Sequence, residues 1–116
     1  MPDGDTRHGC TNGVDTIWLD DRLLYEERRC ALQHELIHLE RGDVGRQSAH
    51  VEAEIRAETA RRLIGWNDLV YAMSWGCSMQ EVAIELAVTV DVLEDRLDGL
   101  RPAVRAMLCR AKDQLA

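Results

Sequence analysis

The stretch YEERRCALQHELIHLERG, residues 25–42, decides how this chain is expected to fold. It contains no proline, and its first glycine is Gly42 at the end, a position where helices commonly stop. Glu26 and Glu27 lie near its start and Arg41 near its end, which is the order of charges that a helix dipole favours. The stretch therefore predicts one long helix.

Three leucines indicate which face of this helix is buried. Leu32, Leu36 and Leu39 recur at helical spacing, and such a stripe usually packs against the rest of a protein. Asp20 or Asp21, just upstream, is expected to cap the N-terminus, because aspartate accepts hydrogen bonds from the first free N–H groups of a helix.

The same helix carries the pattern H-E-L-I-H at residues 34–38. His34 and His38 are four residues apart, so they lie on one face and both imidazoles can bind one cation. Glu35 lies about 100° round the helix, where it can reach a water on the metal. Two histidines that bind Zn²⁺ and a glutamate that acts as general base are the parts of a metallopeptidase site.

A catalytic zinc keeps three protein ligands and one open position, so a third ligand must come from another segment. The next helical segment, residues 49–65, supplies Glu52, Glu54 and Glu58. If its stripe of alanines ending at Ile64 packs inward, Glu54 lies at the edge of that stripe and the other two lie further round. Glu54 is therefore the preferred third ligand. Glu58 could orient a ligand imidazole or exchange roles with Glu54, and the alternative is a solvated acidic face.

The remaining segments predict a single domain of the α+β class that is predominantly α-helical. Residues 1–16 are rich in glycine and polar residues and are expected to form a flexible arm, either loose or turn-forming. A short strand is expected within TIWLDD, residues 16–21, and the metallopeptidase motif region extends over 17–65. The region 66–116 is expected to be a cluster of short helices, at 67–75, 78–87, 90–98 and 102–115.

Composition narrows the class of protein and its partners. The chain has 116 residues and a net charge of −7, which argues against a nucleic-acid surface. No apolar run is long enough to span a membrane. The four cysteines form no C-x-x-C pair, so they are expected to be reduced thiols in the cytoplasm.

A rival pattern lies in SMQEVAIELAVTVDVLEDRLDGL, residues 78–100, which reads like a helix-turn-helix. Its second helix carries four acidic residues against Arg96 alone, and this charge repels DNA phosphates. A DNA-binding regulator is therefore a less favoured alternative, and the preferred interpretation is a helix pair that serves structure.

Residues 16–42, TIWLDDRLLYEERRCALQHELIHLERG, resemble the start of the ImmA/IrrE-type zinc metallopeptidases, in which a strand ending in L-D precedes E-R-R and H-E-L-G-H-L. Ile37 stands where glycine is common in that family. The segment EIRAETARRLI, residues 54–64, is similar to the family's next helix, which begins with a glutamate. The resemblance covers roughly residues 17–64.

This resemblance implies a site and a function. His34, His38 and Glu54 would bind Zn²⁺, and Glu35 would be the general base. The family implies a zinc metallo-endopeptidase of a phage or mobile element, acting in the bacterial cytoplasm on a protein partner, a helix-turn-helix transcriptional repressor. An inactive metal-binding module for protein interaction is the alternative.

Overall fold

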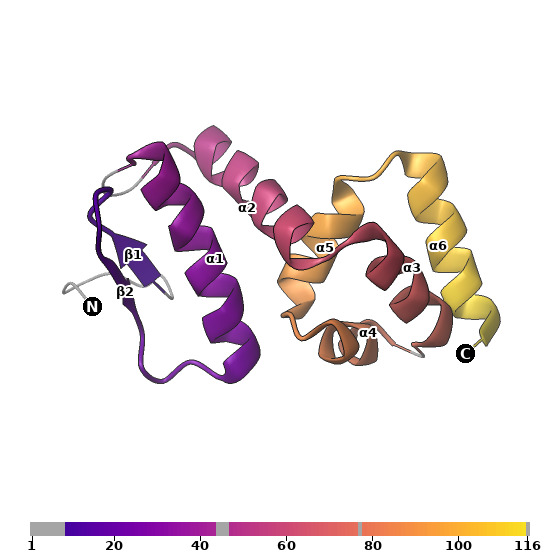
Figure 1. Cartoon of the computed structure of the whole chain (residues 1–116). Coiled ribbons are helices and arrows are strands. Elements are labelled where there is room, and N and C mark those ends of the chain that lie inside the picture. The colour runs from indigo at the N-terminus through magenta and orange to yellow at the C-terminus, as the bar shows by residue number, and fades with distance from the viewer. Residues whose placement is uncertain (1–8, 44–46, 77, 116) are drawn as a thin grey trace. The chain divides into compact units, whose positions relative to one another are not determined.

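A computed structural model of the chain describes residues 9–43, 47–76 and 78–115. In chain order, its elements are β1 (Gly9–Thr11), β2 (Ile17–Leu19), α1 (Tyr25–Arg41), α2 (Ala49–Leu63), α3 (Trp66–Trp75), α4 (Met79–Leu86), α5 (Val90–Asp98) and α6 (Pro102–Leu115) (Figure 1). The predominantly helical α+β fold with a small β element is thus confirmed. Among the described residues, no helix combines the length and the apolar composition that crossing a membrane requires.

The chain divides into two compact units, Met1–Thr59 and Ala60–Ala116, which are described in turn. The boundary between the units lies within α2. The prediction of a single domain stays a prediction.

The first unit begins with a β-hairpin. Strands β1 and β2 pair antiparallel, with Cys10 opposite Trp18. Asn12 closes the turn, because its side-chain oxygen accepts hydrogen bonds from the backbone N–H groups of Val14, Asp15 and Thr16 at 2.9–3.0 Å.

Residues 9–16 therefore differ from the flexible arm that their composition predicted. The asparagine and glycine that suggested a loose segment are the residues that tight turns use, and Gly13 has a φ of 78° in this turn. The rest of the predicted arm, residues 1–8, lies outside the described part of the chain.

Helix α1 packs against both strands of the hairpin (Figure 1). Gly9 lets the first strand come close to the helix. A Cβ atom at this position would lie 2.8 Å from Leu19 Cδ2 and 3.2 Å from Glu35 Cγ, so a larger residue would require these side chains to move.

The two ends of α1 are built differently. The C-terminus is the predicted glycine stop, because Gly42 adopts the left-handed conformation with a φ of 73°. The N-terminal prediction was wrong: Leu24, not Asp20 or Asp21, is the N-cap. Its N–H donates to the Glu27 carboxylate at 2.9 Å, so a residue of the first turn supplies the hydrogen-bond partner of the N-cap.

The buried face of α1 also differs from the prediction. Leu32 and Leu36 are 41% and 37% exposed, and Leu39 is half-buried. Glu35 and His38, in contrast, are only 3% and 2% exposed. The side of the helix that faces inward carries Cys30, Glu35, Ile37 and His38. The hydrophobic stripe therefore does not mark the packed face of this helix, and two polar side chains occupy the interior instead.

In the second unit, the four predicted helices are confirmed with bounds that differ by one residue at most. Helix α3 packs against α4 and α6, and α4 packs against α5. Ser78 starts α4, where its hydroxyl accepts from the N–H of Glu81 at 3.2 Å. The apolar core of this unit consists of Ala60, Ile64, Leu69, Ala72, Met73, Val82, Ala83, Val88, Leu93, Leu97 and Leu108.

Helices α4 and α5 pack against each other and are joined by a short turn. Ala87 turns the chain in the left-handed conformation, with a φ of 55°, and Thr89 caps α5 by accepting from the N–H of Val92 at 3.2 Å. Asp91, Glu94 and Asp98 are exposed on the second helix. The acidic surface expected from the sequence is thus present on α5.

Candidate metal centre

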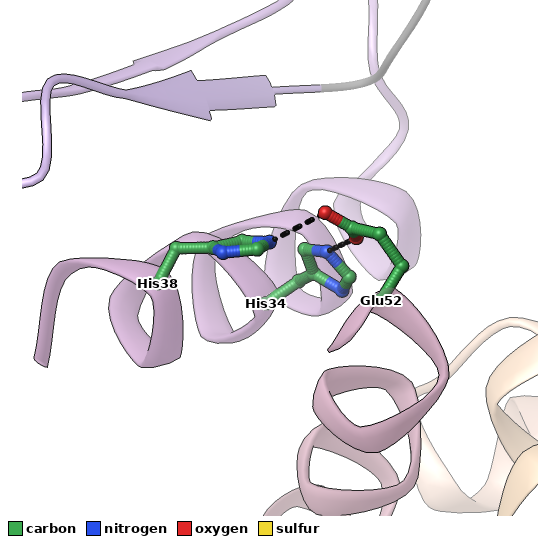
Figure 2. A group of neighbouring side chains, drawn as sticks. All are labelled: His34, His38 and Glu52. Atoms are coloured by element: carbon green, nitrogen blue, oxygen red, sulfur yellow. Dashed lines mark hydrogen bonds and ion pairs between the residues drawn. The ribbon is translucent and has the colours of Figure 1, made fainter. Parts of the chain in front are cut away.

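His34 and His38 of α1 come together with Glu52 of α2 (Figure 2). Their ligand atoms all lie within 4.8 Å of one another. His34 Nε2 lies 3.1 Å from Glu52 Oε2, and His38 Nε2 lies 3.1 Å from Glu52 Oε1. One carboxylate thus reaches both imidazoles, and the three side chains could hold one metal ion.

Helical geometry explains why these side chains meet. The four-residue spacing places the two histidines on one face of α1, with their ring centroids 5.0 Å apart. Ser48 starts α2 by accepting from the N–H of Val51 at 3.2 Å, and Glu52 follows in the first turn.

Two polar atoms of the cluster are buried without a hydrogen-bond partner among the described residues, namely His38 Nε2 and Glu52 Oε1. They lie at ion-pair distance from each other, but their orientation is not that of a hydrogen bond. Leaving a buried polar group unsatisfied costs about 1–3 kcal/mol. A cation between these atoms would satisfy both, so the residues present fit a metal ion.

The other nitrogen of the His38 ring has a partner of its own. His38 Nδ1 lies 3.1 Å from Asp43 Oδ2. The ring therefore joins a carboxylate on one side to the cluster on the other. No feature of the sequence had marked Asp43.

Burial lowers the pKa of His34, and the nearby His38 lowers it further. Glu52 acts in the opposite direction through its charge and its hydrogen bond, but burial prevails. His34 is thereby favoured in its neutral form, which is the form that binds metals.

Glu54 does not join the histidines in the structure. Its side chain is 50% exposed, and its Oε1 lies 3.8 Å from His50 Nε2 and 3.9 Å from a terminal nitrogen of Arg41. Because each residue turns a helix by about 100°, Glu54 points nearly opposite to Glu52. Glu52 therefore takes the place that the sequence had assigned to Glu54.

The packed face of α2 accounts for this difference. Ala53, the first residue of the predicted stripe, is exposed. Ile55 and Thr59 are 0% and 2% exposed, and they follow Glu52 at the three- and seven-residue spacing of one helix face. This Glu-Ile-Thr spacing was the sequence signal that favoured Glu52.

The remaining predicted site residues lie outside the three-residue cluster. Glu58 is half-buried on α2. Glu35 is buried on α1 with its Cγ close to Gly9 of the hairpin. Its assignment as the general base stays a prediction, and a base is not expected to be a ligand.

Two imidazoles and one carboxylate are a donor set that catalytic zinc sites use. We found no match to this chain among models of protein families, curated proteins or solved structures. The resemblance to the ImmA/IrrE-type metallopeptidases therefore rests on the sequence motif alone.

Proposed function

We propose that this chain is a zinc-dependent metallo-endopeptidase of the ImmA/IrrE type. Its substrate would be a protein in the bacterial cytoplasm, a helix-turn-helix repressor of a phage or mobile element. The observation that carries the proposal is the cluster of His34, His38 and Glu52, within an H-E-x-x-H helix. Three protein ligands leave one position of a tetrahedral zinc open for chemistry.

His34 Nε2, His38 Nε2 and the Glu52 carboxylate would hold the zinc. When bound, zinc acts as a Lewis acid and lowers the pKa of a coordinated water to about 7. Glu35 would accept the proton as the water attacks the peptide carbonyl and would then deliver it to the leaving amine nitrogen. Burial of Glu35 keeps this carboxylate away from bulk solvent.

A metal-stabilised module for protein interaction is the second candidate. It is favoured by the apolar side chains of Tyr25, Leu32 and Leu36, which are 68%, 41% and 37% exposed along one side of α1. DNA is not the partner we propose, because the exposed residues of α5 are acidic and would repel phosphates.

The variant Glu35→Gln distinguishes the two candidate functions, a metallo-endopeptidase and a metal-stabilised module for protein interaction. Glutamine keeps the size of the side chain but cannot accept the proton, and a general base contributes about 10²–10⁴-fold to a rate. We expect cleavage of a co-encoded repressor to slow by at least the lower figure while zinc binding is retained. Glu40→Gln, an exposed glutamate on the same helix, is the matched control and should cleave like the wild type.

The assay is a cleavage time course with a chelated wild-type sample beside it. Equal rates for Glu35→Gln and wild type would refute the general-base role. If the zinc-loaded wild type binds the repressor and never cuts it, the interaction module is the better description.

A further inference from the structure

We propose that Asp43 is a positioning residue for the metal centre, which fixes the orientation and the tautomer of His38. The proposal rests on the metal site described above and adds a residue that neither the motif nor the resemblance identifies. The observation is a carboxylate oxygen 3.1 Å from the ring nitrogen that faces away from the cluster.

The chemistry of the pair sets the tautomer. An ionised carboxylate can only accept hydrogen bonds, so His38 Nδ1 must carry the proton that it donates to Asp43. The neutral ring then has no proton on Nε2, and the lone pair of Nε2 points to the cluster. The His38 side chain is 3% exposed, so water cannot easily replace Asp43 as the acceptor.

The backbone at the end of α1 holds Asp43 in place. Gly42 reverses the chain in the left-handed conformation, and the N–H of Asp43 donates to the carbonyl oxygen of His38 at 2.9 Å. The same residue thus binds the main chain of His38 with its N–H and the ring with its carboxylate. The glycine stop therefore also orients the proposed metal ligand.

Arg41 contributes positive charge beside this carboxylate. Its Nε lies 3.6 Å from Asp43 Oδ2, and a terminal nitrogen lies 3.9 Å from Glu54. Arg41 is 41% exposed, so we expect the ion pairs themselves to contribute little stability. Glu54 thereby becomes a useful control, because it shares Arg41 with Asp43 but lies outside the cluster of His34, His38 and Glu52.

A carboxylate behind a ligand imidazole holds the ring in its binding orientation and makes the ligand nitrogen more basic. Removing such a partner typically costs about 10–100-fold in metal affinity. We expect Asp43→Ala to lose zinc affinity in this range. Asp43→Asn should lose less, because the amide oxygen can still accept from Nδ1.

The experiment has two readouts on the full chain. The first is zinc affinity, measured by competition with a chromophoric chelator for wild type, Asp43→Ala, Asp43→Asn and Glu54→Gln. The second is the tautomer of His38 in the metal-free proteins, read from ¹⁵N chemical shifts at a pH above the usual histidine pKa of about 6.5. Wild type and Glu54→Gln should show Nδ1–H, and Asp43→Ala should populate Nε2–H.

The two readouts distinguish failure of the role of Asp43 from failure of the proposed zinc-dependent function. An unchanged tautomer in Asp43→Ala, or zinc affinity within about threefold of wild type against an expected loss of about 10-fold or more, would overturn the role of Asp43. If the wild type binds no zinc, the proposed function fails, and the tautomer alone decides about Asp43. If circular dichroism shows that Asp43→Ala is unfolded, Asp43→Leu takes its place in both readouts, because leucine keeps roughly the size of the side chain but has no acceptor.

Discussion

Helix α1 and the pair α4–α5 differ in the kinds of side chain that they bury. In the helix pair, Val82, Leu93 and Leu97 are 0–1% exposed, and Asp91, Glu94 and Asp98 face solvent. In α1, the regularly spaced Leu32 and Leu36 are more than one-third exposed, while polar side chains lie inside. In the helix pair, hydrophobic spacing therefore agrees with burial, as is usual. In α1 it does not.

The difference teaches where to look for function. Burying an imidazole and a carboxylate is unfavourable unless each polar atom has a partner. In α1 these groups are His38 and Glu35. The two ring nitrogens of His38 lie close to Asp43 and Glu52, respectively. A helix that buries polar side chains does so at a cost in stability, and a bound metal ion would compensate for part of that cost.

The largest effect we predict compares the same truncation in the two regions. Leu93→Ala should lower the free energy of unfolding by about 2–5 kcal/mol, because it leaves a cavity at a fully buried position. Leu32→Ala should cost about 0.5 kcal/mol or less, as exposed positions do. Urea denaturation of the metal-free proteins measures both. Similar losses for the two variants would mean that Leu32 is packed, and the contrast between the regions would disappear.

A smaller effect concerns the residues that end α1 and α4. Gly42 and Ala87 both have a positive φ, 73° and 55°, but only glycine adopts this conformation without strain. Gly42→Ala should therefore destabilise the protein by about 1 kcal/mol, and Ala87→Gly should stabilise it by a similar amount. Thermal unfolding of the two variants gives the signs. Destabilisation by Ala87→Gly would show that the methyl group of Ala87 contributes more than its strain costs.

The smallest effect is the pKa of His34 in the metal-free protein. Burial lowers this pKa, so the folded protein should release the His34 proton at a lower pH than the unfolded chain, whose histidines titrate near about 6.5. The unfolded state then binds more protons, and His34 makes the folded state less stable as the pH falls below that value. An NMR titration of the His34 ring, with and without urea, measures the difference. A folded pKa equal to or above the unfolded one would contradict the effect of burial.

Much of the fold could be predicted from the sequence because local signals decide it. The span of α1, its stop at Gly42 and the four later helices follow from spacing, glycine and capping residues. The N-cap of α1 could not be predicted this way, because it is Leu24, whose side chain cannot accept a hydrogen bond. Its N–H is bound by Glu27 of the first turn instead. The second strand of the hairpin was predicted, but its partner β1 was missed, because the same kinds of residue compose tight turns and loose arms.

The candidate site could be predicted only in part. His34 and His38 lie on one helix, so their proximity follows from helical geometry alone. The carboxylate comes from a second helix, and its choice depends on which face of that helix packs. The alanine stripe pointed to Glu54, whereas burial of Ile55 brings Glu52 to the histidines. The contact of Asp43 with His38 could not be predicted, because it depends on the backbone conformation after Gly42.

The most direct test of the account is a zinc titration of the purified protein, without chelator, that compares Glu52→Gln with Glu54→Gln. We predict about one zinc per wild-type chain. Glu52→Gln loses a proposed ligand, so its zinc affinity should fall by more than the loss of about 10–100-fold that is typical when a supporting residue is removed. Glu54→Gln should bind zinc like the wild type. Absence of zinc binding by the wild type, or a larger loss for Glu54→Gln than for Glu52→Gln, would contradict the proposed metal centre of His34, His38 and Glu52.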